Sequence, residues 1–78
     1  MTITQALGSR IRWLRQEDRL SQTQLAARAG IQQSVISRLE RGEVADVHLS
    51  AVLKLARVLR IEPGFLIEGI EDEAEGRR

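Results

Sequence analysis

Four polar side chains between positions 33 and 38 have the chemistry needed to bind the edges of DNA bases. They are Gln33, Ser34, Ser37 and Arg38. A glutamine amide can pair with adenine N6 and N7, an arginine guanidinium can pair with guanine O6 and N7, and a serine hydroxyl can bond to either base. None of the four is acidic. The alternative interpretation is an ordinary polar helix face that contacts only water.

Helical periodicity places these side chains on one face of a short helix. Apolar residues recur at the spacing of an inward-facing stripe, at Val35, Ile36 and Leu39. An advance of 100° per residue turns the polar residues, and Arg41 with them, to the opposite side. A preceding helix has its own apolar stripe, formed by Leu25, Ala26 and Ala29. The pattern therefore predicts two short helices in succession.

Glycines and a cap mark the ends of these two helices. Gly30 lies between them, where a residue without Cβ can adopt the left-handed conformation that closes a helix and reverses the chain. Gly42 repeats this stop signal after the second helix. At the start, Ser21 and Gln24 have the spacing of a capping box, in which each side chain bonds a free backbone N–H. The segment from Ser21 to Gly42 is thus predicted to be a helix-turn-helix.

The same segment matches a family pattern. Its shared elements are Ser21, Gln22, Leu25, Ala26, Gly30, Ile36, Ser37, Leu39, Glu40 and Gly42. With them the chain resembles the phage-repressor and Cro-like family, also called the xenobiotic-response-element family. The resemblance extends from about residue 7 to residue 69. It implies an all-α, compact five-helix, lambda-repressor-like domain whose second and third helices are the helix-turn-helix.

The resemblance also implies roles for individual residues. The second of the two helices would read bases through Gln33, Ser34, Ser37 and Arg38, and phosphates would be bound by Gln22, Thr23, Arg41 and Arg12. In the family, the glutamine at the position of Gln22 both touches the DNA backbone and supports the first recognition residue. A structural ion pair is expected between Arg15 and Glu40.

Composition restricts the other possibilities. The chain of 78 residues has no cysteine and one histidine, His48, so a disulfide framework and a thiolate metal site are excluded and a cytoplasmic setting is expected. No apolar run reaches the length of a membrane span. One Trp, one Phe and no Tyr leave little material for stacking unpaired bases. No nucleophile lies beside a base at a catalytic spacing, and we expect neither an enzyme nor a cofactor.

Charge is distributed unevenly along the chain. Residues 1–61 contain ten basic and five acidic side chains, whereas residues 62–78 contain two and six. The predicted helix-turn-helix lies in the basic part, as a phosphate-binding surface requires. The segment after it departs from the family, because Glu43 and Asp46 stand where relatives often have Lys, Arg or Asn. Carboxylates repel phosphates, so we expect this loop to make no direct contact with DNA.

Three further helices are expected around the helix-turn-helix. The first extends from about residue 4 to 18 with an apolar stripe at Ile3, Leu7, Ile11 and Leu14, and with a partly buried Trp13 at the margin of the core. The fourth extends from residue 49 to 60, with an inner face of Leu49, Val52, Leu53, Ala56 and Leu59. The fifth extends from Pro63, whose fixed φ suits a first turn, to residue 68.

Three successive apolar residues in the fifth helix cannot all face one core, because neighbours diverge by 100°. The resemblance implies a two-fold dimer contact here, so we expect Phe65 and Ile67 at the interface and Leu66 in the core. The alternative is an intramolecular cover by residues 71–78. We expect instead that residues 1–70 form the domain and that this acidic tail is disordered.

These features predict a sequence-specific, double-stranded DNA-binding transcriptional regulator that acts as a homodimer on a pseudo-palindromic operator. Its size is similar to that of restriction-modification controller proteins and compact phage repressors, with RNA polymerase as a further partner and no membrane association. The alternative is a protein-interaction module or the antitoxin of a toxin-antitoxin pair. Activation and repression of transcription both remain open.

Overall fold

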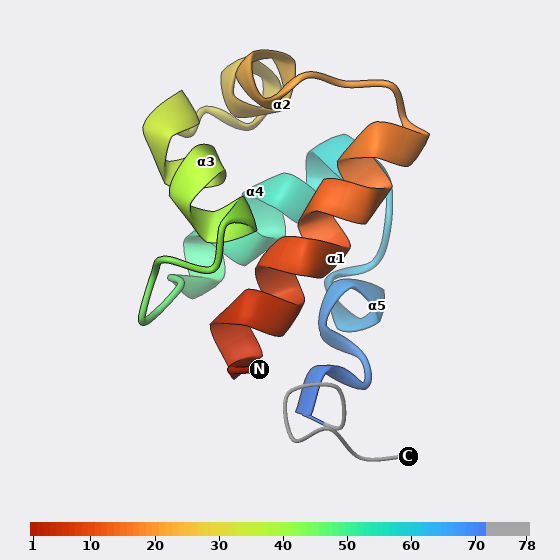
Figure 1. Ribbon diagram of the computed structural model, residues 1–78. Helices are drawn as coiled ribbons and strands as arrows, with labels where there is room; N and C mark the ends of the chain where they lie inside the picture. The colour runs from red at the N-terminus through yellow and green to blue at the C-terminus, as the bar shows by residue number, and fades with distance from the viewer. Residues whose placement is uncertain (72–78) are drawn as a thin grey trace.

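The computed structural model describes residues 1–71 and contains five helices and no strand over that range (Figure 1). The helices are α1 (Ile3–Glu17), α2 (Gln22–Ala29), α3 (Gln33–Glu40), α4 (Leu49–Leu59) and α5 (Pro63–Ile67). The predicted all-α, five-helix architecture is confirmed. The predicted disordered tail lies outside the described residues except for Glu71, which is exposed.

One core unites all five helices. Each helix contributes one large side chain that is fully buried, and these are Ile11, Leu25, Ile36, Leu55 and Leu66. The helix α1 packs against α3 and α5, while α2 packs against α3 and α4. Figure 1 shows α3 on one side of α1 and α5 on the other. The α3 face that points away from the core is therefore separate from α5.

The start and end of α2 have the geometry predicted from the sequence. Ser21 accepts a hydrogen bond from the backbone N–H of Gln24, whose side chain accepts one from the Ser21 N–H. Gly30 has φ 69° and ψ 34°, in the left-handed region. A second capping box, between Thr2 and Gln5, begins α1. Local sequence thus determines where the helix-turn-helix starts and turns.

The end of α3 is closed by a Schellman motif. Gly42 has φ 71°, and its N–H donates to the Leu39 carbonyl at 3.0 Å. The Glu43 N–H donates to the Arg38 carbonyl at 2.9 Å. These two bonds satisfy carbonyls that the end of a helix leaves free, and they fold the chain back beside its own last turn. Glu43 is thereby brought next to Arg41.

Gly8 allows the backbones of α1 and α3 to pack in close contact. A Cβ placed on Gly8 would lie 1.9 Å from the backbone oxygen of Leu39 and 3.3 Å from the Cα of Glu40. Because backbone atoms cannot move aside as a flexible side chain can, only glycine fits this crossing without a shift of the helices. Gly8 therefore fixes the position of α3 on the body of the protein.

Two predictions for α1 are wrong. Ile3 and Trp13 are exposed, whereas Ala6, Leu7 and Ile11 are buried and Leu14 is half-buried. Ile3 is the first residue of α1, and 55% of it stays exposed there. Trp13 is two residues from Ile11, which turns it about 200° away from the most deeply buried position.

The predicted inner face of α4 is also partly wrong. Leu49 and Leu53 are exposed, and Leu55 is fully buried in their place. The helix has more apolar residues than one stripe can hold, and its contacts with α2 and α5 select the stripe that contains Val52, Leu55, Ala56 and Leu59. Ile70 is also buried, so the core continues beyond α5.

Within residues 1–71, no helix has the length and apolar character that crossing a bilayer requires.

Candidate nucleic-acid interface

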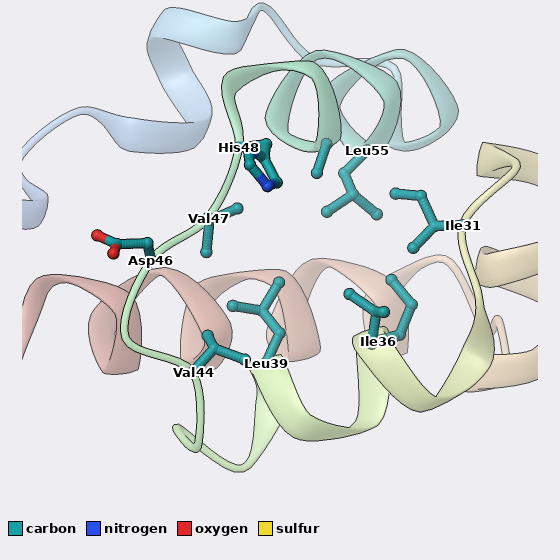
Figure 2. Close-up of a pocket in the computed structure, with 10 residues that line it drawn as sticks. Ile31, Ile36, Leu39, Val44, Asp46, Val47, His48 and Leu55 are labelled. Atoms are coloured by element: carbon teal, nitrogen blue, oxygen red, sulfur yellow. The ribbon is translucent and has the colours of Figure 1, made fainter.

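The inner face of α3 determines the direction of its outer face. Figure 2 shows Ile36 and Leu39 from α3 and Leu55 from α4 pointing into a small apolar pocket of about 80 Å³, which Val47 also lines. Asp46 also lines the pocket, and its carboxylate points away from the centre of the pocket (Figure 2). Because the inner side chains of α3 are held by the core, the opposite face of the helix is turned outward.

The four predicted base-reading residues lie on this outward face. Gln33, Ser34 and Arg38 are exposed, and Ser37 is half-buried. Gln33 and Ser37 are four residues apart, as are Ser34 and Arg38, and this spacing places the four residues along one side of a helix. We call this set of Gln33, Ser34, Ser37 and Arg38 the polar ridge.

A buried ion pair connects α1 to the end of α3. Arg15 donates from Nε to Glu40 Oε2 at 2.7 Å and from Nη2 to Glu40 Oε1 at 2.8 Å. Its Nη1 donates to the Leu20 carbonyl at 2.7 Å. The two side chains are only 11% and 2% exposed. The predicted pair is therefore present, with the bidentate geometry that makes arginine-carboxylate pairs strong.

Electrostatics keeps Arg15 charged. The hydrogen bond to Glu40 raises the pKa of the Arg15 guanidinium above its ordinary value, against the opposing effect of burial and with a further Coulomb contribution from the same carboxylate. A buried carboxylate left without its partner would cost about 3 to 5 kcal/mol. The pair consequently holds the C-terminal end of α3 against α1.

Gln22 extends this network to the polar ridge. Its Nε2 donates to Glu40 Oε1 at 3.0 Å, and its Oε1 accepts a hydrogen bond from Gln33 Nε2 at 2.8 Å. An amide nitrogen has two hydrogens, so Gln33 retains one donor and its own carbonyl oxygen for a base. These are the two groups that a bidentate contact with adenine uses. The first residue of the ridge is thereby held in a defined orientation.

The remaining ridge residues differ in how free their side chains are. Arg38 has no hydrogen-bond or ion-pair partner within residues 1–71, which leaves its planar fork available. Ser37 Oγ lies 2.6 Å from Arg41 Nη1 and accepts a hydrogen bond from it. Ser34 is exposed beside them. The ridge thus combines one preoriented amide, one unpaired guanidinium and two hydroxyls.

The candidate phosphate-binding groups flank the ridge. The backbone N–H groups of Gln22 and Thr23 lie in the first turn of α2, where a helix has no internal acceptor and its dipole favours an anion. Arg12 lies about 40° round α1 from Gly8, on the side that packs against α3. Arg41 is at the end of α3, and it also pairs with Glu43. The sequence pattern did not predict that pairing.

The fifth helix presents the predicted apolar surface. Phe65 is 65% exposed and Ile67 is 49% exposed, whereas Leu66 is fully buried. Arg10 attaches this helix to α1, since its Nη1 donates to the carbonyls of Phe65, Leu66 and Glu68. More than 50 residues separate these partners along the chain, and no local sequence signal indicates the contact.

The five helices surround one core, and α3 exposes a polar face. Gly30 ends α2 and lets the chain turn into α3. This arrangement defines a helix-turn-helix domain. Residues 11–66 match the model of the helix-turn-helix family, and the chain belongs to that family, in its Cro and phage-repressor class. Proteins of this family are DNA-binding regulators of transcription rather than enzymes. Comparison with curated proteins finds no match.

The chain is similar to solved structures, among them the following two. The restriction-modification controller protein C.AhdI from Aeromonas hydrophila is 41% identical, with a TM-score of 0.76, over 81% of this chain and 94% of that protein. The SinR protein, in its complex with the SinI protein, is 26% identical, with a TM-score of 0.78, over 92% of this chain and 67% of that one. Both similarities cover most of the chain.

Proposed function

We propose that this chain is a sequence-specific regulator of transcription that binds double-stranded DNA as a homodimer, in the manner of a restriction-modification controller protein or a phage-type repressor. The observation that carries the proposal is the polar ridge. Its residues point outward from a core-held helix, and the Gln22 amide fixes the orientation of Gln33. The 41% identity to C.AhdI supports the controller assignment.

The position of α5 supports a dimer that binds two half-sites. Phe65 and Ile67 are exposed on α5. The helix α5 lies on the other side of α1 from α3 (Figure 1), so a two-fold contact through α5 would leave both ridges free. Two recognition helices in adjacent major grooves lie about 34 to 36 Å apart on a pseudo-palindrome. A homodimer would therefore read two inverted copies of a short sequence.

Selection of bound duplexes from a random pool tests this proposal. We expect an enriched sequence with two inverted halves, and an affinity that falls linearly with salt on logarithmic axes because bound phosphates release counterions. A pool without enrichment, together with salt-independent binding, would contradict it.

A protein-interaction role is the second candidate. The similarity to SinR in complex with SinI, together with the exposed apolar side chains of α5, favours it. An apolar contact of this kind depends weakly on salt and shows a negative heat-capacity change, so calorimetry with a captured partner distinguishes it from DNA binding.

A further inference from the structure

Three side chains form a hydrogen-bonded group at the C-terminal end of the polar ridge. Arg41 donates from Nη1 to Ser37 Oγ at 2.6 Å and from Nη2 to Glu43 Oε1 at 3.0 Å. The Schellman motif places Glu43 there, since its N–H bonds back to the Arg38 carbonyl. The position of the carboxylate is thus determined by the backbone that ends α3.

This ion pair is exposed, unlike the pair of Arg15 and Glu40. The side chains of Arg41 and Glu43 are 56% and 54% exposed. Exposed pairs contribute little to stability, because water and salt screen them. A phosphate can therefore replace the Glu43 carboxylate, and the cost of doing so is small.

We propose that Glu43 is a built-in competitor for the phosphate that Arg41 binds, and that it lowers the affinity of the protein for every duplex. This inference rests on the proposed DNA-binding function. Glu43 occupies one edge of the guanidinium while Ser37 holds another, so Arg41 is kept along the outer face of α3 in the absence of DNA. A bound phosphate must displace the carboxylate or lie beside it, and either arrangement is less favourable than binding an uncompensated arginine.

Neutralisation of Arg41 by Glu43 also changes the salt dependence of DNA binding. An unpaired basic residue that binds a phosphate releases condensed counterions and contributes about 0.9 to the slope of log K against log salt. An arginine already neutralised by a carboxylate brings less net charge to the DNA. Arg41 should therefore contribute less to the slope than Arg12, although both are exposed basic side chains beside α3.

The test is the Glu43→Gln substitution, measured as duplex affinity in the full chain at low salt. Asp46→Asn is the matched control, because it removes the same charge from the same loop and Asp46 has no ion-pair partner within residues 1–71. Glu43→Gln should raise affinity for selected and random duplexes alike by roughly two- to five-fold per subunit, the range that one exposed pair allows. The slope should steepen by up to about 0.9 per subunit.

Making Glu43→Gln in a chain that already lacks Arg41 shows whether the gain in affinity depends on Arg41. In a chain that carries Arg41→Ala, the gain from Glu43→Gln should shrink to that of Asp46→Asn, because the competitor no longer has a target. Equal gains from the two substitutions in the chain with Arg41 would overturn the proposal and show general repulsion only. Failure of the wild-type chain to bind any duplex would instead remove the proposed function itself.

A second measurement needs no change at Glu43. Arg12→Ala and Arg41→Ala are compared by the slope of log K against log salt. The slope should fall clearly less for Arg41→Ala than for Arg12→Ala. An equal or larger fall for Arg41→Ala would mean that Glu43 does not neutralise it.

Discussion

The side-chain amide of Gln33 donates a 2.8 Å hydrogen bond to Oε1 of Gln22, and Gln22 in turn donates to Glu40 of the buried ion pair. The outward face of α3 is thereby connected to the buried contact between α1 and α3. A side chain held in this way loses less conformational freedom when it binds a base, because its orientation is already set.

Gln22→Ala should consequently relax the base preference opposite Gln33. The substitution removes the acceptor that orients the Gln33 amide, and we expect discrimination at that base pair to fall by about 1 kcal/mol, at the low end of what a bidentate contact supplies. Selection from a random pool with the variant measures this as a flatter profile at one position in each half-site. Gln16→Ala, an exposed glutamine on α1, is the control and should leave the profile unchanged.

Arg12→Ala should weaken binding to all duplexes by similar factors. Arg12 lies on the side of α1 that packs against α3, and a phosphate contact there carries no sequence information. We expect the slope of log K against log salt to fall by about 0.9 per subunit. Salt titrations on a selected and a random duplex measure both effects. A loss confined to the selected duplex would assign Arg12 to base reading instead.

Gly8→Ala should lower the free energy of unfolding by about 1 to 3 kcal/mol or more. The reason is that a Cβ there would lie 1.9 Å from the Leu39 backbone oxygen. Gly64→Ala is the control, since nothing lies within 4 Å of its added Cβ. Denaturant unfolding measures the free energy of both variants. A stable Gly8→Ala chain would show that α1 and α3 can separate without loss.

Phe65→Asp should convert the proposed homodimer to monomers, because a carboxylate buried at a two-fold contact would face its own copy. Sedimentation equilibrium gives the mass directly. Leu49→Asp is the matched control, since Leu49 is 69% exposed and lies on α4. A Phe65→Asp chain that still sediments as a dimer would remove Phe65 from the interface.

The parts of this fold that local sequence determines were predictable. The capping box of Ser21 and Gln24, the left-handed Gly30 and the alternation of buried and exposed residues in α3 depend on neighbours within a few positions. The pair of Arg15 and Glu40 was also predicted, but only through the family resemblance, because no local pattern links residues 25 positions apart.

Features that depend on distant packing were not predictable. The α4 sequence allows two overlapping apolar stripes, and only contact with α2 and α5 selects the one with Leu55 over that with Leu49 and Leu53. Nothing around Gly8 indicates that another backbone approaches it. The pairing of Glu43 with Arg41 follows from the Schellman turn, whose two bonds bring side chains together that the sequence alone leaves unrelated.

Arg38→Ala tests the central claim, that the polar ridge reads bases, most directly. Its affinity is measured on the selected duplex and on random duplex, with Arg57→Ala on the exposed side of α4 as the control. The claim predicts a loss of about 1 to 3 kcal/mol on the selected duplex, a much smaller loss on random duplex and a flattened preference at one base pair of each half-site. Equal losses on both duplexes, or no loss on either, would contradict it.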